Sequence, residues 1–230
     1  MSARDTVVVG ARGSGLKALQ ILEDRQDDGD RTFHLIGFVD DDPALRGSDF
    51  YDYPVIGTVA DLVARAQRHE IDVVCAVGDP VARHYIVSQL ADTRACFPNA
   101  IHPSAQVSRR AGIGRGNLFS QNVVLQAGVT MGDFNAVNMG AVFGPLATVG
   151  SYCTINAQVM LASGSAAGDF CYVGMGAKVD ARLALGRGTR VGANAFVTKP
   201  TEPWTTVFGL PAKVIRRRLD PFAEPDVRRA

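Results

Sequence analysis

The feature that most constrains this chain is a six-residue rhythm of apolar side chains in its second half. From position 101 to position 197, every sixth residue is apolar without interruption. A period of six matches neither the helical period nor the alternation of a plain strand. It matches a solenoid in which one short strand and one turn build each side of a coil. The positions are Ile101, Val107, Ile113, Phe119, Leu125, Met131, Val137, Phe143, Val149, Ile155, Leu161, Ala167, Val173, Val179, Leu185, Val191 and Val197.

Glycine adds a second rhythm of eighteen residues, which predicts triangular coils with one glycine corner each. Tight corners need backbone angles that glycine adopts without steric cost. Asn138 and Asn156 are expected at corners too, because asparagine tolerates the left-handed region. The pattern predicts a parallel β-helix of about five coils, with small side chains inside its corners. The glycines are Gly114, Gly132, Gly150, Gly168 and Gly186, and the small residues are Ala141, Ala147, Cys153, Ser165, Cys171, Ala177 and Ala195.

Composition excludes several classes of partner. The chain has 230 residues and a formal net charge of +1, so no global field favours nucleic acid or a membrane surface. No apolar run approaches the ~20 residues of a membrane span. The apolar stretch at residues 7–9 is too short for a signal peptide. We therefore expect a cytoplasmic protein with no nucleic-acid partner and no membrane partner.

The four cysteines do not form a CxxC pair, so no metal site is expected. Cys153 and Cys171 are eighteen residues apart and should stack on adjacent coils. A reduced interior pair is the expected state in the cytosol, and a disulfide is the alternative. Cys75 lies in an apolar run and is expected in the core.

The first hundred residues alternate between strand and helix patterns. This alternation predicts a small parallel α/β unit of the Rossmann kind. We therefore expect a Rossmann-like domain at residues 1–99, the β-helix at 100–215 and a basic flexible tail at 216–230. The expected strands are residues 7–9, 33–39 and 71–77, and the expected helices begin near residue 16, cover 59–69 and run to residue 90.

A glycine turn after the first strand is a candidate ligand site. Its spacing, Gly10, Gly13 and Gly15 with Ser14 between them, is not the dinucleotide pattern G-x-G-x-x-G. Such a turn can still place amides around phosphates. Asp40 and Asp41 end the second strand, where a ribose or a base is usually bound. The alternative is a turn of the fold that binds no ligand.

The whole chain resembles the bacterial nucleotide-sugar N-acyltransferases, which acetylate UDP-amino sugars and have relatives that act on sialic acid. The resemblance covers about residues 5–215 and implies that the β-helix is the left-handed hexapeptide type, which breaks the usual crossover rule. The segments that carry it are Val7–Ala11, Gly13–Gly15, Gly37–Pro43, Pro54–Gly57, Ala76–Asp79 with Arg83, Ile101–Ala105 and Gly209–Lys213.

The family implies a homotrimer that takes acetyl-CoA or another acyl-CoA as co-substrate. The acyl-CoA lies in the groove between two prisms, and a nucleotide-linked amino sugar reaches in from the α/β domain. Carried onto this chain, the substrate-binding residues are Gly10, Gly13, Ser14, Gly15, Asp40, Asp41 and Arg83. The acyl-CoA residues are Ser163, Gly174, Met175, Gly192, Ala193, Lys199 and Lys213, although each glycine is also explained by a coil turn.

The chain departs from the family at the catalytic base. The family's histidine follows an acidic residue, and the matching positions here are Pro145 and Gly144. A second histidine, near the thioester in the family, corresponds to Thr154. Proline cannot accept a proton, and a general base typically contributes about 10²–10⁴-fold. An amine that binds neutral is already a nucleophile, so we expect an amine acceptor rather than a hydroxyl.

Three functions remain open from the sequence. The first is an acyl-CoA-dependent N-acyltransferase that works by proximity and an oxyanion contact. For that contact Asn138 is the first candidate and Thr154 another, although Asn138 also fits a corner role. The second is a catalytically inactive homologue that binds a nucleotide sugar or an acyl carrier. The third is an enzyme on the same scaffold with a different amine acceptor.

Overall fold

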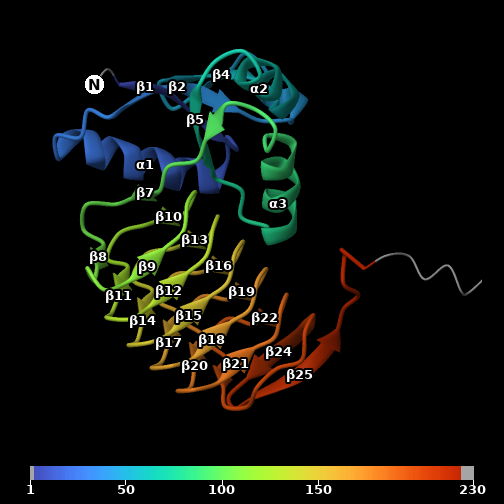
Figure 1. Ribbon diagram of the computed structural model, residues 1–230. Helices are drawn as coiled ribbons and strands as arrows, with labels where there is room; N and C mark the ends of the chain where they lie inside the picture. Colours follow the sequence, from blue (N-terminus) through green and yellow to red (C-terminus); the bar gives the residue numbers. More distant parts are fainter. Residues whose placement is uncertain (1–2, 224–230) are drawn as a thin grey trace, which may run out of the picture.

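The computed structural model describes residues 3–223, which form an α/β domain stacked on a long triangular coil (Figure 1). The α/β domain contains one six-stranded sheet in the order β3-β4-β2-β1-β5-β6. All neighbours in this sheet are parallel except β3 and β4. The strands are β1 (Arg4–Val9), β2 (Phe33–Val39), β3 (Asp49–Phe50), β4 (Tyr53–Gly57), β5 (Ile71–Cys75) and β6 (Ala95–Cys96).

Three α-helices and a short 3-10 turn accompany the sheet, and local signals set where each begins. The side chains of Thr58 and Asp61 form a reciprocal capping box at the start of α2. Asp79 caps α3 and is followed by Pro80 in the first turn, where a missing N–H costs nothing. The elements are α1 (Gly13–Asp27), the 3-10 turn η1 (Pro43–Leu45), α2 (Val59–Ala66) and α3 (Pro80–Gln89).

The coil is a parallel β-helix, as the six-residue rhythm predicted, and it is the left-handed type that the family resemblance implied. Each strand pairs with the strand eighteen residues later, so Phe119 lies beside Val137 and Leu125 beside Phe143. The first strands of each coil form a sheet that we call the domain-facing sheet. It contains β7 (Ala100–Ile101), β10 (Leu118–Phe119), β13 (Ala136–Val137), β16 (Thr154–Ile155), β19 (Tyr172–Val173), β22 (Arg190–Val191), β24 (Thr205–Gly209) and β25 (Ala212–Arg217).

The other two sides of the prism are sheets of two-residue strands. The apolar sheet contains β8 (Gln106–Val107), β11 (Val124–Leu125), β14 (Val142–Phe143), β17 (Met160–Leu161), β20 (Lys178–Val179) and β23 (Phe196–Val197). The small-residue sheet contains β9 (Gly112–Ile113), β12 (Thr130–Met131), β15 (Thr148–Val149), β18 (Ala166–Ala167) and β21 (Ala184–Leu185).

Burial within the coil follows the six-residue rhythm closely. From Phe119 onward, the periodic apolar residues are all buried in one core. The small residues of the rhythm are buried as well, including Ala141, Cys153 and Cys171. Both of these cysteine thiols are free, and burial raises the pKa of Cys153 well above its usual value.

Two details of the corners differ from the sequence prediction. The repeating glycines, such as Gly150 and Gly168, are not in the left-handed region. They are required because a Cβ there would meet the next coil, at 2.7 Å from the Asp169 amide nitrogen for Gly150. Asn138 and Asn156 also have ordinary backbone angles. From Ile113 to Val191, the left-handed positions lie three residues after each periodic apolar residue.

One corner carries a ladder of aromatic side chains that fixes the α/β domain on the coil. Phe134, Tyr152 and Phe170 stack with centroids 5.2 and 5.3 Å apart, and Trp204 continues the ladder. His84 of α3 packs edge-on against Tyr152 at 5.0 Å. This packing holds α3, and with it the carboxyl edge of the parallel sheet, against the domain-facing sheet.

The end of the coil differs from the expected boundary at residue 216. Arg216 and Arg217 belong to β25, which pairs with β24, so the strand continues into the segment expected as a tail. Phe222 then packs on Phe170. The rest of the expected tail, residues 224–230, lies outside the described residues. Among the helices of residues 3–223, none has the length and apolar character that a membrane crossing requires.

Candidate functional site

A cleft between the α/β domain and the coil brings together the polar residues of both. It consists of three adjoining hollows of about 510, 330 and 260 Å³. The first lies at the glycine turn, the second between the two domains and the third at the corner that carries Asn138. Lys17 of α1 lines all three. We call them the loop hollow, the central hollow and the corner hollow.

The glycine turn forms the wall of the loop hollow, with Gly10, Gly13 and Ser14 among its lining residues. Gly10 has a φ of 100°, which favours glycine. Gly15 is required for another reason, because a Cβ there would lie 2.0 Å from the Gly10 carbonyl oxygen. The first amides of α1 have no acceptor within the helix, and Arg12 does not cap them. The turn therefore presents free N–H groups at a positive helix end, which suits an anion such as a phosphate.

The two aspartates after β2 differ in position. Asp40 lines the loop hollow, and its carboxylate accepts hydrogen bonds from the amides of Ala11 at 2.8 Å and Asp42 at 2.9 Å. Asp41 instead accepts the amide of Val59 at 2.9 Å and so supports the start of α2. The structure brings Asp40 to the glycine turn and gives Asp41 a role in the neighbouring helix.

Arg83 lies beneath the cleft and not in it. Its side chain is 1% exposed, and its guanidinium donates to the carbonyls of Val77, Phe134 at 2.8 Å and Tyr152 at 3.0 Å. Burial lowers the pKa of this guanidinium. Thr154 is 3% exposed, lines the central hollow and donates its hydroxyl to the Gly78 carbonyl at 2.7 Å. Both side chains therefore tie the domains together, whereas the sequence had suggested a substrate contact for Arg83.

A polar row runs along the corner between the domain-facing and apolar sheets, at one position per coil. Asn138 donates to the Asn156 side chain at 3.2 Å, and its Oδ1 accepts from Lys17 Nζ at 2.9 Å. Ser120 stands one coil earlier, is 3% exposed, and its hydroxyl has no hydrogen-bond partner although it lines the corner hollow. The row therefore offers the carboxamide of Asn138 to a ligand in the cleft, whereas the Ser120 hydroxyl oxygen is buried.

The sequence did not point to Lys17 or Ser120, although signals for both were present. Lys17 begins the second turn of α1, four residues after Gly13, and therefore lies on the same face of the helix as the glycine turn. Ser120 is eighteen residues before Asn138, which is one coil earlier at the same corner. Only the docking of α1 on the coil shows that these two positions meet.

The residues expected to bind acyl-CoA lie at several places on the coil. Gly174 and Gly192 continue the Asn138 row, Met175 lines the corner hollow and Ala193 follows Gly192. A Cβ on Gly174 would lie 2.6 Å from the Ala193 amide nitrogen, so close packing of the coils also explains this glycine. Lys199 and Lys213 share a separate hollow of about 330 Å³ near β25.

Pro145 and Ser163 lie at a different corner, between the apolar and small-residue sheets. They are one coil apart, and the Pro145 carbonyl accepts the Gly164 amide at 2.9 Å. Asn138 precedes β14 and Pro145 follows it, so β14 separates the two positions within one chain. Pro145 is exposed and does not line the three hollows of the cleft.

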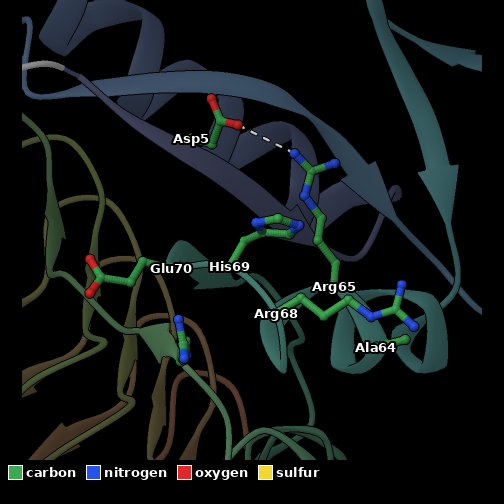
Figure 2. Close-up of a pocket in the computed structure, with 7 residues that line it drawn as sticks. Asp5, Ala64, Arg65, Arg68, His69 and Glu70 are labelled. Atoms are coloured by element: carbon green, nitrogen blue, oxygen red, sulfur yellow. Dashed lines mark hydrogen bonds and ion pairs between the residues drawn. The ribbon is translucent and has the colours of Figure 1, made fainter.

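A larger hollow on the α/β domain is separate from this cleft (Figure 2). It is lined by the end of α2 and the start of β1, and in it Arg65 is paired with Asp5 at 3.3 Å. Arg68 and His69 are other lining residues. This hollow has no wall from the coil. Within residues 3–223, no three or more His, Cys, Asp or Glu side chains are grouped so that they could hold a metal ion.

Comparison with known proteins identifies a matching domain family and solved structures that share this architecture. Residues 5–90 match the family model of the PglD N-terminal domain. The chain is similar to a histidine-to-asparagine variant of perosamine N-acetyltransferase from Caulobacter crescentus, solved with CoA and GDP-perosamine. The identity is 28% and the TM-score 0.83, over 91% of this chain and 96% of that one. A search of curated proteins found no match.

Two other solved structures are similar over most of their length. The acetyltransferase domain of PglB from Neisseria gonorrhoeae FA1090, in complex with acetyl coenzyme A, is 28% identical with a TM-score of 0.83 over 93% of this chain and all of that one. WeeI from Acinetobacter baumannii AYE is 25% identical with a TM-score of 0.79, over 91% and 99%. A Rossmann-like domain on a left-handed β-helix, with a cleft between them, defines a sugar acyltransferase scaffold. Together, the family match of residues 5–90 and the similarity to these solved structures support the nucleotide-sugar N-acyltransferase family for this chain.

Proposed function

We propose that this protein transfers an acyl group, with acetyl as the expected one, from acyl-CoA to the amine of a nucleotide-linked amino sugar. The observation that carries the proposal is the continuous cleft that joins the glycine turn to Asn138. Similar proteins were solved with CoA and GDP-perosamine or with acetyl coenzyme A. A phosphate-binding turn and a carboxamide at the two ends of one cleft suit a nucleotide sugar whose amine points to the coil.

The nucleotide sugar fits the cleft in one orientation. The free amides of Gly13 and Ser14 at the start of α1 hold the diphosphate, and Asp40 beside them accepts a donor of the ribose or the base. The sugar then occupies the central hollow, which is lined by Asn138 and Thr154. Because the hydroxyl of Thr154 already donates to Gly78, we assign the contact with the acceptor amine or the oxyanion to Asn138.

The acyl-CoA fits along the Asn138 corner. Gly192 is partly accessible and Ala193 is exposed there, so a pantetheine chain can lie against the backbone, and Met175 lines the adjoining corner hollow. Gly174 is buried and allows the coils to pack closely beneath this path. The lysines Lys199 and Lys213 suit the phosphates of the CoA nucleotide. The thioester then meets the amine at Asn138, and holding the two reactants in place can supply ~7–11 kcal/mol of the barrier.

The reaction proceeds without a histidine base in this proposal. The family position of the histidine is Pro145, whose ring nitrogen carries no proton and accepts none. The acceptor amine attacks the thioester carbonyl, the C–S bond breaks, and the thiol of CoA leaves with the proton lost from nitrogen. This route requires the amine to bind in its neutral form.

We also propose a homotrimer, because the apolar sheet leaves large side chains uncovered. Met160 points outward from this sheet and is 45% exposed, while Met139, Met175 and Leu146 are 54%, 58% and 67% exposed at its two edges. Three copies with this sheet toward a common axis would cover them. The Asn138 corner of each copy would then adjoin Pro145 of the partner subunit. That arrangement suits acyl-CoA between two prisms.

We also propose a cytoplasmic location, which the free, buried thiols of Cys153 and Cys171 support.

The test is calorimetric titration of the protein with acetyl-CoA, and then with UDP-, dTDP- and GDP-linked amino sugars. Mass spectrometry of the mixed components measures the acylated product. Binding of both partners with product formation supports the proposal. Binding of a nucleotide sugar without acyl transfer would favour an inactive homologue, which the loss of the histidine also permits. Transfer only to a non-sugar amine would favour a changed acceptor.

A further inference from the structure

Lys17 is a charged side chain in direct contact with Asn138, the residue to which we assign the acceptor amine. Its Nζ lies 2.9 Å from Asn138 Oδ1 and reaches across the cleft from α1 to the coil. If the amine also donates to this oxygen, two donors share one acceptor, and their nitrogens lie about 4–5 Å apart. At that distance a like charge strongly disfavours the protonated form of an amine.

The carboxylates in and around the cleft have other partners, so none of them is paired with the positive charge of Lys17. Arg12 is paired with Asp42 by a short contact, and Asp79 with Arg190 at 3.0 Å. Tyr172 lies under the Arg190 guanidinium at 5.5 Å. Asp40, in the loop hollow, is bound by the amides of Ala11 and Asp42. Among the described residues that line the cleft, Lys17 is therefore the cation without a carboxylate partner.

We propose that Lys17 is a catalytic residue that keeps the acceptor amine neutral by charge repulsion, and so replaces the missing base. This inference rests on the proposed function, because it takes the amine to bind at Asn138. On binding, an amine that is protonated in solution loses one proton to the solvent. Its lone pair then forms the C–N bond as the C–S bond breaks, and the second proton leaves with the thiol. Lys17 keeps its own proton throughout.

Proton release on binding is the direct measurement. An amine flanked by oxygen-bearing carbons titrates near an α-amino group, at about 8. A nearby cation lowers the pKa of such an amine by about 1–3 units. Titration of the nucleotide amino sugar at pH 7, in buffers of different ionisation enthalpy, should therefore show release of about 0.8 proton per site for a shift of two units. An analogue with a hydroxyl in place of the amine should release none.

Two substitutions separate charge from other roles of Lys17. Lys17→Met should abolish the proton release and bind the amino sugar nucleotide at least about tenfold more tightly at pH 6, since one pKa unit is a factor of ten. It should slow acyl transfer and leave the hydroxyl analogue's affinity unchanged. Lys17→Arg keeps the charge and should restore the proton release that Lys17→Met loses, with turnover above that of Lys17→Met. Arg68→Met, in the remote hollow of Figure 2, is the matched loss of a cation and should change nothing.

Each outcome tests either the proposed role of Lys17 or the proposed acyltransferase function on which it rests. Binding of the amino sugar without proton release overturns the role of Lys17 and leaves the acyltransferase intact. Equal weakening of amino and hydroxyl nucleotides by Lys17→Met also overturns it, because Lys17 would then be a phosphate contact. Loss of turnover in Lys17→Arg would make Lys17 a proton acceptor instead. Proton release without acyl transfer supports Lys17 and contradicts the proposed function, and failure to bind any amino sugar contradicts both.

Discussion

We propose that Pro145 occupies the position of the family's histidine, and it lies at a corner of the coil that is exposed in the single chain. Restoring the base by Pro145→His should raise kcat and add a titration near pH 6.5, the range of an imidazole. The affinity for the nucleotide sugar should not change, because the residue lies outside the three hollows in which we place that substrate. The measurement is the pH dependence of kcat with binding by calorimetry. An enzyme-borne titration near neutrality already present in the natural chain would contradict the proximity mechanism.

Asn138 is the residue at which the two substrates meet in our proposal. Asn138→Ala removes the carboxamide that bonds Lys17 and Asn156, so turnover should fall by about tenfold or more. Removal of one oxyanion donor lowers kcat by about 10²–10³-fold, and this is the largest loss that we expect. Steady-state kinetics check this, with Gln89→Ala on the surface of α3 as the control. A rate equal to that of the natural chain would leave Asn138 as a residue of the corner only.

At the level of the elements, the sequence predicts the coil better than the cleft. The coil repeats, so Phe143 pairs with Leu125 and Leu161, its equivalents eighteen residues away on the two neighbouring coils. Periodicity alone therefore indicates that Phe143 is buried. The meeting of Lys17 with Asn138 depends on how α1 docks on the coil, which no local pattern encodes. The same holds for Arg83, since its family motif suggested a ligand contact. Its carbonyl partners Phe134 and Tyr152 lie on adjacent coils, more than fifty residues further along the chain.

The contact between α3 and the coil gives a prediction about stability. Arg83→Met would remove the buried guanidinium and leave the carbonyls it binds, such as that of Phe134, without this donor. Each such loss costs about 1–3 kcal/mol, so a total of about 3 kcal/mol is expected. In a protein of this size that lowers Tm by roughly 6–12 °C. Thermal unfolding measures it against Arg68→Met as the exposed control, and a fall of less than about 2 °C would show that Arg83 does not hold the interface.

At the scale of the whole molecule, we propose that contacts through the apolar sheet form the trimer and that the acyl-CoA groove exists only between two of its subunits. In the trimer we propose, Met160 from each of three chains lies near one axis, so Met160→Glu places three carboxylates together in a desolvated interface. Like charges and desolvation both oppose this, and the trimer should dissociate. Sedimentation velocity measures the assembly, and Thr148→Glu on the small-residue sheet is the control that should remain trimeric. Because acyl-CoA is proposed to lie between two prisms, the dissociated variant should lose acetyl-CoA affinity and keep nucleotide-sugar affinity, whose site lies within one chain. A monomeric natural chain that binds acetyl-CoA with full affinity would contradict both the assembly and the placement of the groove.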